Sequence, residues 1–234
     1  MIGKNIKAKP ENEDAPDFLA ESEGDEQDNN KKAFKSYREA RRFVNLNELD
    51  LALENVQNAL SIDTVDGDNY NRADVCFLAM QICRRAKEYL MALDYIEDGI
   101  KSVNPYRVDG PKFMLAKGVV LLQIAETEQS ASKREKHLGT AIESFKMAIS
   151  VSGVLLARKT KYRFEAKDIS IIRRYQQISL FDAAYAHDLA GHRRDAIASL
   201  DRLFELYPHF RVEKTPFELY DKILAEKRVV HIAK

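Results

Sequence analysis

The chain has 234 residues, enough for one sizeable domain or for an elongated repeat array with a tail. Hydrophobic residues make up 45% of it and charged residues 32%, a balance typical of a folded, water-soluble protein. With only 9 glycines and 6 prolines, the chain favours long helices over many short strands joined by turns. The composition therefore predicts an all-α fold.

The sequence indicates a cytoplasmic protein without membrane insertion. Residues 1–10 carry lysines but no apolar core, so no secretory signal is expected, and the longest apolar run, residues 119–125, is too short to span a bilayer. The two cysteines, Cys76 and Cys83, form no disulfide framework, which fits a reducing compartment. Their seven-residue spacing places them on one helix face, where we expect two small buried side chains.

The N-terminal segment is strongly acidic. Residues 11–28 contain nine Asp and Glu and no basic residue. Such a segment has too little apolar surface to offset its ordering entropy, so we expect residues 1–30 to form a disordered tail. The remainder of the chain carries an excess of basic residues.

One pattern of small and large apolar residues occurs four times after the tail. Its offsets of zero, four and seven place the side chains on one helical stripe. A small residue at the first offset lets a neighbouring helix approach closely. The four copies are Ala52-Leu53, Val56, Ala59-Leu60; Ala92-Leu93, Ile96, Gly99-Ile100; Ala141-Ile142, Phe145, Ala148-Ile149; and Ala196-Ile197, Leu200, Leu203-Phe204.

A second apolar helix precedes the stripe in three copies. Ala40, Met80 and Ala184 each lie twelve residues before the alanine that opens the stripe, which leaves room for a turn and a reversal. The third copy departs from this spacing, because Gly118, its candidate small residue, lies 23 residues before Ala141. We therefore expect helical hairpins, with a longer loop or longer helices through residues 126–136. Asn47 with Asp50, and Ser132 with Glu135, are predicted to cap the helices that follow them.

The last copy resembles the tetratricopeptide repeat family, whose unit is a helix–turn–helix of about 34 residues. The residues at the family's signature positions are Leu180, Ala183-Ala184, His187, Ala196, Leu200, Leu203 and Pro208. The resemblance implies an α-solenoid of about four helical hairpins over residues 31–212, with a C-terminal capping helix and tail over 213–234. An armadillo-like or other α-solenoid is the alternative.

The resemblance also implies a binding surface, a concave groove built mainly from the first helix of each hairpin. Aromatic side chains next to arginine suit peptide recognition, although some of these residues could instead pack against a neighbouring helix. The predicted partner-binding residues are Tyr37, Arg41, Phe77, Gln81, Arg84, Leu115, Val119, Phe181, Tyr185 and Asp188. Tyr37, Arg41 and Leu78 stand where the chaperone-binding members have lysine and asparagine, so a carboxylate clamp is not expected.

No catalytic motif is present. The chain lacks a Gly-rich phosphate loop, CxxC, HExxH, GxSxG and an Asp-rich calcium loop. Its five histidines are scattered, and His187 falls at a repeat core position, where we expect a packing role. The sequence thus predicts a protein that is not an enzyme and needs no cofactor or metal.

A basic stretch provides the alternative function. It comprises Arg158, Lys159, Lys161, Arg163, Lys167, Arg173 and Arg174, with Tyr162, Phe164 and Tyr175 among them. This mixture could hold RNA through phosphate contacts and base stacking, or it could be a solvated linker. We rank nucleic acid after an acidic protein partner because the net charge is zero.

The main prediction is a scaffold or adaptor in a larger intracellular assembly, and an enzyme with an unrecognised site is the third reading.

Overall fold

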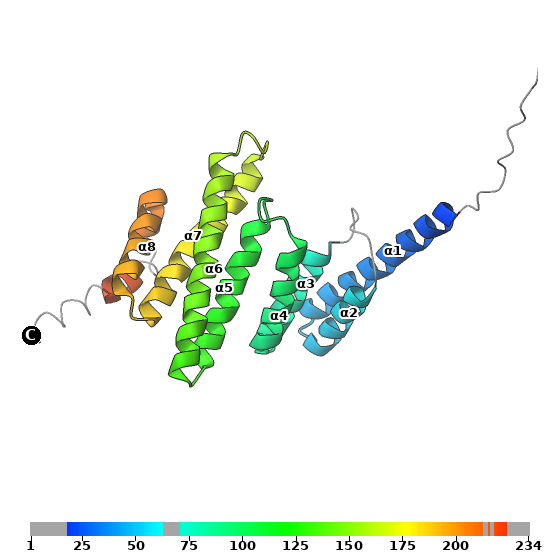
Figure 1. Ribbon diagram of the computed structural model, residues 1–234, viewed down its shortest axis with the longest axis horizontal. Coiled ribbons are helices and arrows are strands. Elements are labelled where there is room, and N and C mark those ends of the chain that lie inside the picture. Colours follow the sequence, from blue (N-terminus) through cyan, green and yellow to red (C-terminus); the bar gives the residue numbers. More distant parts are fainter. Residues whose placement is uncertain (1–17, 63–70, 213–214, 216–217, 224–234) are drawn as a thin grey trace, which may run out of the picture.

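The computed structural model describes residues 18–62, 71–212, 215 and 218–223, and nearly all of this part is helical (Figure 1). Its helices are α1 (Phe18–Asn45), α2 (Leu49–Ser61), α3 (Arg72–Arg85), α4 (Tyr89–Ser102), α5 (Gly110–Thr127), α6 (Ala131–Ala157), α7 (Ala166–Leu189) and α8 (Arg193–Leu206), followed by the 3-10 helix η1 (Pro208–Val212). The described residues contain no β-strand, so the predicted all-α class is confirmed.

The helices follow one another in chain order along the long axis of the molecule (Figure 1). Each helix packs against the next one in the sequence, and α1 and α2, α3 and α4, α5 and α6, and α7 and α8 form four antiparallel pairs. Contacts also join first helices of successive pairs, α1 with α3 and α5 with α7. An ion pair between Asp74 on α3 and Lys112 on α5 links the remaining neighbours, so the four first helices are close enough to share one surface.

The same turn joins the two helices of the first, second and fourth pairs. Asn47, Lys87 and Gly191 lie in the left-handed region, with φ of 60°, 63° and 77°. In each turn the next residue donates a backbone hydrogen bond to the carbonyl five residues earlier, as in the Schellman motif: Glu48 N to Phe43 O (2.9 Å), Glu88 N to Cys83 O (2.8 Å) and His192 N to His187 O (2.8 Å). The predicted capping role of Asn47 is wrong, because Asn47 terminates α1 and Glu48 is the N-cap of α2.

Gly191→Ala should destabilise the protein by about 1 kcal/mol, because a Cβ disfavours the left-handed conformation that ends α7. No described atom lies within 4 Å of the added Cβ, so the loss would come from the backbone alone. Lys87→Gly is the converse variant and should not destabilise, since Lys87 already adopts this conformation. Urea unfolding followed by circular dichroism would measure both, and equal stability of Gly191→Ala and wild type would contradict the turn assignment.

The predicted stripe faces the core in every pair. Ala52, Ala92, Ala141 and Ala196 are each 0% exposed, as expected for close-contact positions. Gly118 on α5 has the same role in the third pair, since a Cβ there would lie 2.4 Å from Cε1 of Phe145 on α6. The small residues therefore set how closely the two helices of a pair can approach.

The third pair differs from the others in helix length and not in loop length. Helix α5 continues to Thr127 and α6 begins at Ala131, so a short connection joins two long helices. Ser130 is the N-cap of α6 without a side-chain cap, and the predicted capping box at Ser132 is wrong because Ser132 lies inside the helix. Helix α6 is long and apolar enough to span a membrane, but half of its apolar window is buried against the rest of the structure.

The N-terminal end of the array differs from the prediction. Residues 18–30, assigned to the disordered tail, belong to α1, while residues 1–17 lie outside the described residues. Extending an existing helix costs far less than nucleating one, and Asp28 pairs with Lys32 (2.7 Å) one turn later. At the other end residues 218–223 are helical, and Leu219 and Ile223 are buried in the core of the α5–α8 region.

Candidate partner-binding face

Side chains at helical spacing on the first helices form one continuous row, which we call the first-helix face. It consists of Tyr37 and Arg41 on α1; Asp74, Phe77, Gln81 and Arg84 on α3; Lys112, Leu115, Val119, Gln123 and Glu126 on α5; and Tyr175, Ile178, Asp182 and Tyr185 on α7. Their spacings of three or four residues place each set on one side of its helix. The contacts described below join the sets across neighbouring helices.

Lys112 connects α5 to α3. Its Nζ lies 3.3 Å from Oδ1 of Asp74 and 4.2 Å from the ring centroid of Phe77. Phe77 in turn meets Phe113 edge to face, with ring centroids 5.5 Å apart. A cation held between a carboxylate and an aromatic ring is a contact worth on the order of 1 kcal/mol at a partly exposed site. This cluster fixes Phe77 in a half-buried position on the face.

Arg84 makes the second link between α3 and α5. Its Nε donates a hydrogen bond to Oε1 of Gln123 at 2.8 Å. Burial lowers the pKa of Arg84, and the charge of Asp182 on α7 opposes that effect. Asp182 itself is partly buried, and burial raises its pKa to about 7, although the Arg84 charge lowers it. Three first helices thus place polar groups together in the middle of the face.

The α7 end of the face is partly taken up by contacts within the chain. Tyr185 Oη donates a hydrogen bond to Oε1 of Glu126 on α5 at 3.1 Å. Asp188 pairs with Nζ of Lys222 at 3.0 Å, and the Asp188 side chain is only 6% exposed. Asp188 is therefore engaged by a lysine of the C-terminal helix, and its role in partner binding stays a prediction.

The α1 end of the face carries an aromatic and arginine pair. The Arg41 guanidinium lies 5.9 Å from the ring centroid of Tyr37, and Phe34 is the next aromatic neighbour, 6.5 Å away. Burial raises the pKa of Tyr37, with the charge of Asp74 adding to this effect. Arg41 is exposed while Tyr37 is half-buried, so this end offers an accessible cation over an aromatic ring.

Besides Asp188, the predicted partner-binding residues fall into three groups according to their exposure. Arg41 and Gln81 are exposed, and Gln81, Arg84 and Arg85 line a shallow pocket of about 240 Å³. The half-buried side chains are Tyr37, Phe77, Arg84, Val119, Phe181 and Tyr185. Leu115, at 9% exposure, is a buried member of the core of the α5–α8 region, so little of its side chain is open to a partner.

Sequence reasoning did not assign several members of the face to partner binding, namely Asp74, Lys112, Gln123, Glu126, Tyr175, Ile178 and Asp182. Helical spacing could have found them, because each lies three or four residues from a predicted position or from another member. Ile178 is an exposed apolar side chain, at 36% exposure, one turn from Asp182. The resemblance implied only two or three positions on each first helix, and the other members of the face lie beside them on the same side.

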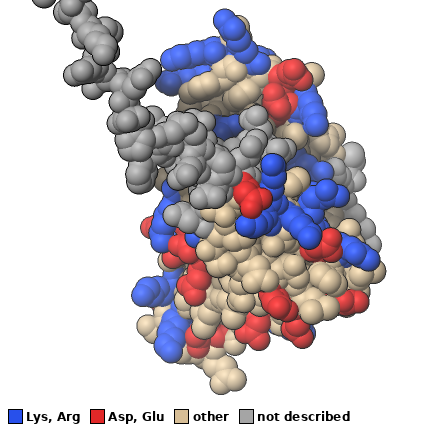
Figure 2. Space-filling model, turned by 90° about the vertical axis from the view of Figure 1, so that its right-hand side faces the viewer, with Lys and Arg blue, Asp and Glu red and all other residues tan. Residues whose placement is uncertain are grey.

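The basic stretch surrounds the connection between α6 and α7, which is the highest part of the described residues in Figure 1. Its seven Lys and Arg residues are exposed, and Figure 2 shows basic side chains gathered at this upper end with acidic ones among them. Tyr162 and Phe164 stack on each other (5.4 Å) and pack against a small core that includes Leu155 and Ile172. Their rings are therefore engaged within the protein.

The two acidic residues inside the basic stretch have a structural role. Glu165 is the N-cap of α7, and it forms a reciprocal capping box with Asp168, whose Oδ2 accepts the Glu165 backbone N–H at 3.1 Å. This arrangement satisfies backbone donors that the first turn of a helix leaves open. The acidic interruption of the stretch thus follows from the start of a helix.

No protein-family model matches this chain, and no curated protein matches it either. The tetratricopeptide resemblance therefore stays a prediction from the residues.

Proposed function

We propose that this protein is a non-enzymatic scaffold or adaptor, an α-solenoid of four tetratricopeptide-like helical hairpins that holds a peptide or helix of a partner protein on the first-helix face. The proposal places it in the cytoplasm, within a multi-protein assembly. The observation that carries it is the row of contacts from α3 to α7, with Lys112, Arg84 and Tyr185 bridging neighbouring helices.

The chemistry of the face supports a protein partner. Tyr and Arg are enriched at interfaces, because they bury large area with few rotatable bonds or form several hydrogen bonds. The face carries cations at Arg41 and Arg84 and acidic groups at Asp74 and Asp182. The exposed Ile178 lies one turn from Asp182 on α7. A surface with both signs and an apolar element suits a mixed peptide better than a uniformly acidic polymer.

Replacing Arg41 by Glu together with Gln81 by Ala should remove the partner while leaving the fold intact, because both side chains are exposed. A loss of at least about tenfold in affinity is expected, since it reverses one interface charge and truncates a second contact. Affinity purification of the full chain from cell lysate, followed by measurement of the recovered partner's affinity, would provide the test.

The matched control is Arg194→Glu with Gln129→Ala, which makes the same chemical changes at exposed positions on α8 and in the connection before α6. This control should bind like wild type. A partner that is retained by the first-helix variant and lost by the control would contradict the proposed location of the site.

The second candidate function is RNA binding through the basic stretch, and it is favoured by the exposure of all seven cations around one helix connection. Affinity for a structured RNA would then fall steeply with salt, and Lys159→Glu with Arg163→Glu would abolish it. If RNA did not bind, or bound with an affinity independent of salt, the RNA-binding function would be excluded and the protein-binding function favoured.

A further inference from the structure

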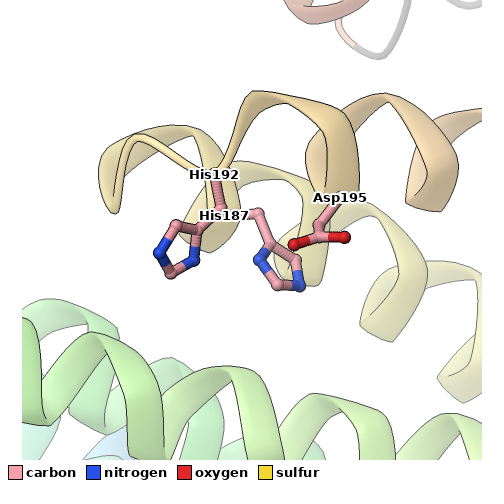
Figure 3. A group of neighbouring side chains, drawn as sticks. All are labelled: His187, His192 and Asp195. Atoms are coloured by element: carbon pink, nitrogen blue, oxygen red, sulfur yellow. The ribbon is translucent and has the colours of Figure 1, made fainter.

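A group of possible metal ligands lies at the turn between α7 and α8. His187 is in the last turn of α7, His192 is the N-cap of α8, and Asp195 is in its first turn. One ligand atom from each residue lies within 4.8 Å of the other two. Figure 3 shows the His187 imidazole between the ring of His192 and the carboxylate of Asp195.

Backbone hydrogen bonds of the turn hold these three residues together. His192 N–H donates to the His187 carbonyl at 2.8 Å, and Asp195 N–H donates to the His192 carbonyl at 3.0 Å. The two histidine rings have centroids 5.9 Å apart. The left-handed Gly191 makes this reversal possible, so the same turn that ends α7 assembles the group.

His187 provides a second and independent observation. Its side chain is 4% exposed, and its Nδ1 atom is buried with no hydrogen-bond partner among the described residues. Buried polar atoms in folded proteins nearly always have a hydrogen-bond or metal partner. We therefore expect the buried Nδ1 atom of His187, which lies beside two further possible ligands, to bind one. Burial and the charge of Lys146 lower the pKa of His187, while Asp195 raises it.

The group borders a pocket of about 480 Å³ between α6, α7 and α8. His187 and Asp195 line this pocket, which gives an ion access from solvent. Lys146 and Arg202 also line it, but both side chains are exposed and long enough to direct their charges into water.

We propose that His187, His192 and Asp195 bind a divalent transition-metal ion, preferentially zinc, through two imidazole nitrogens and one carboxylate oxygen. Such nitrogen and oxygen donors suit zinc, and three protein ligands leave a fourth position for water or for a ligand from a partner protein. Bonds of about 2.0–2.2 Å require the ligand atoms to come closer than they are here. His192 and Asp195 are exposed and can make that movement by side-chain rotation around the fixed His187.

The sequence did not indicate this site. His187 and His192 are five residues apart, a spacing that also occurs in known zinc sites, but no further ligand pair accompanies them in the sequence and His187 was assigned a packing role. These spacings bring the three side chains together because the end of α7 and the start of α8 meet at the turn.

Calorimetric titration of the full-length, tag-free chain with zinc chloride would test the proposal. One zinc ion should bind per chain. His192→Ala and Asp195→Asn should each weaken binding at least about tenfold, because even groups outside the coordination shell contribute that much. His187→Gln should have the same effect, but the two exposed positions carry the test because their variants leave the core unchanged. Cobalt(II) should give the visible absorption of a tetrahedral site, which the variants would lose.

His137→Ala, a histidine on α6 outside the group, is the matched control and should bind zinc like wild type. Absence of zinc binding would overturn the proposal. So would binding that persists in both His192→Ala and Asp195→Asn, since the metal would then lie elsewhere, for example on Cys76 and Cys83. Binding of inorganic phosphate but not of zinc, lost in Lys146→Ala, would identify an anion pocket and also refute the metal site.

Discussion

Gly118→Ala should destabilise the protein by about 1–3 kcal/mol, because it inserts a methyl group where two helices are in closest contact. The new Cβ would lie 2.4 Å from Cε1, 2.6 Å from Cδ1 and 2.8 Å from Cζ of Phe145. Phe145 is 0% exposed and belongs to the largest core cluster, so its ring cannot move into solvent. Helices α5 and α6 must therefore separate, and urea unfolding should show a lower midpoint.

A second substitution distinguishes this collision from other effects of the added methyl group. Phe145→Leu should cost about 1–3 kcal/mol alone through lost packing. Combined with Gly118→Ala it should cost less than the sum of the two single variants, since the shorter side chain makes room for the new Cβ. Additive losses would mean that the two positions do not compete for space.

Gly139→Ala provides the control, because Gly139 is an exposed residue of α6 with no described atom within 4 Å of its added Cβ. This variant should stabilise the protein by about 0.5–1 kcal/mol through helix propensity alone. The opposite signs of two Gly→Ala substitutions on paired helices would establish that close packing, and not propensity, determines the result. If Gly118→Ala also stabilised the protein, the packing of α5 on α6 would be wrong.

The fold was predictable wherever local periodicity and close packing act together. The alanine-led stripes identified the second helix of all four pairs, since a small residue lets the two helices of a pair approach each other closely. The third pair was harder to define, because its extra residues could have formed a loop or extended helices. Lengthening both helices keeps backbone hydrogen bonds and buries residues such as Leu138, which a long loop would not do.

The candidate face was less predictable, because helical spacing shows on which side of a helix a residue lies but not how deeply the rest of the protein buries it. Leu115 and Tyr37 occupy comparable places on their helices, three residues before Gly118 and Ala40, yet Leu115 is buried in the core of the α5–α8 region and Tyr37 is only half-buried. Asp188 was assigned to partner binding without knowledge that Lys222 would reach it from the C-terminal helix. Such contacts between distant parts of the sequence have no signal in local periodicity.

Asp182→Asn should abolish most of the loss of stability that the wild-type protein undergoes between about pH 4 and pH 7. Burial raises the pKa of Asp182 to about 7 from an ordinary value of 3.8. In this range the unfolded chain loses the carboxyl proton while the folded protein keeps it, so the folded state binds more protons and its stability falls as pH rises. The neutral amide of asparagine does not titrate, and it should make the variant more stable than wild type at pH 8 by up to about 4 kcal/mol.

Two further variants identify the cause of this pH dependence. Asp201→Asn, at an exposed position of α8, should leave the wild-type profile unchanged. Arg84→Gln removes the cation that lowers the Asp182 pKa, so the descending part of the profile should extend to higher pH. Urea unfolding at a series of pH values would measure all three. If the stability of wild type and of Asp182→Asn declined in parallel with pH, another group would be responsible. If Arg84→Gln shifted the pH profile and adding Asp182→Asn removed that shift, the titrating group would be Asp182 on the first-helix face.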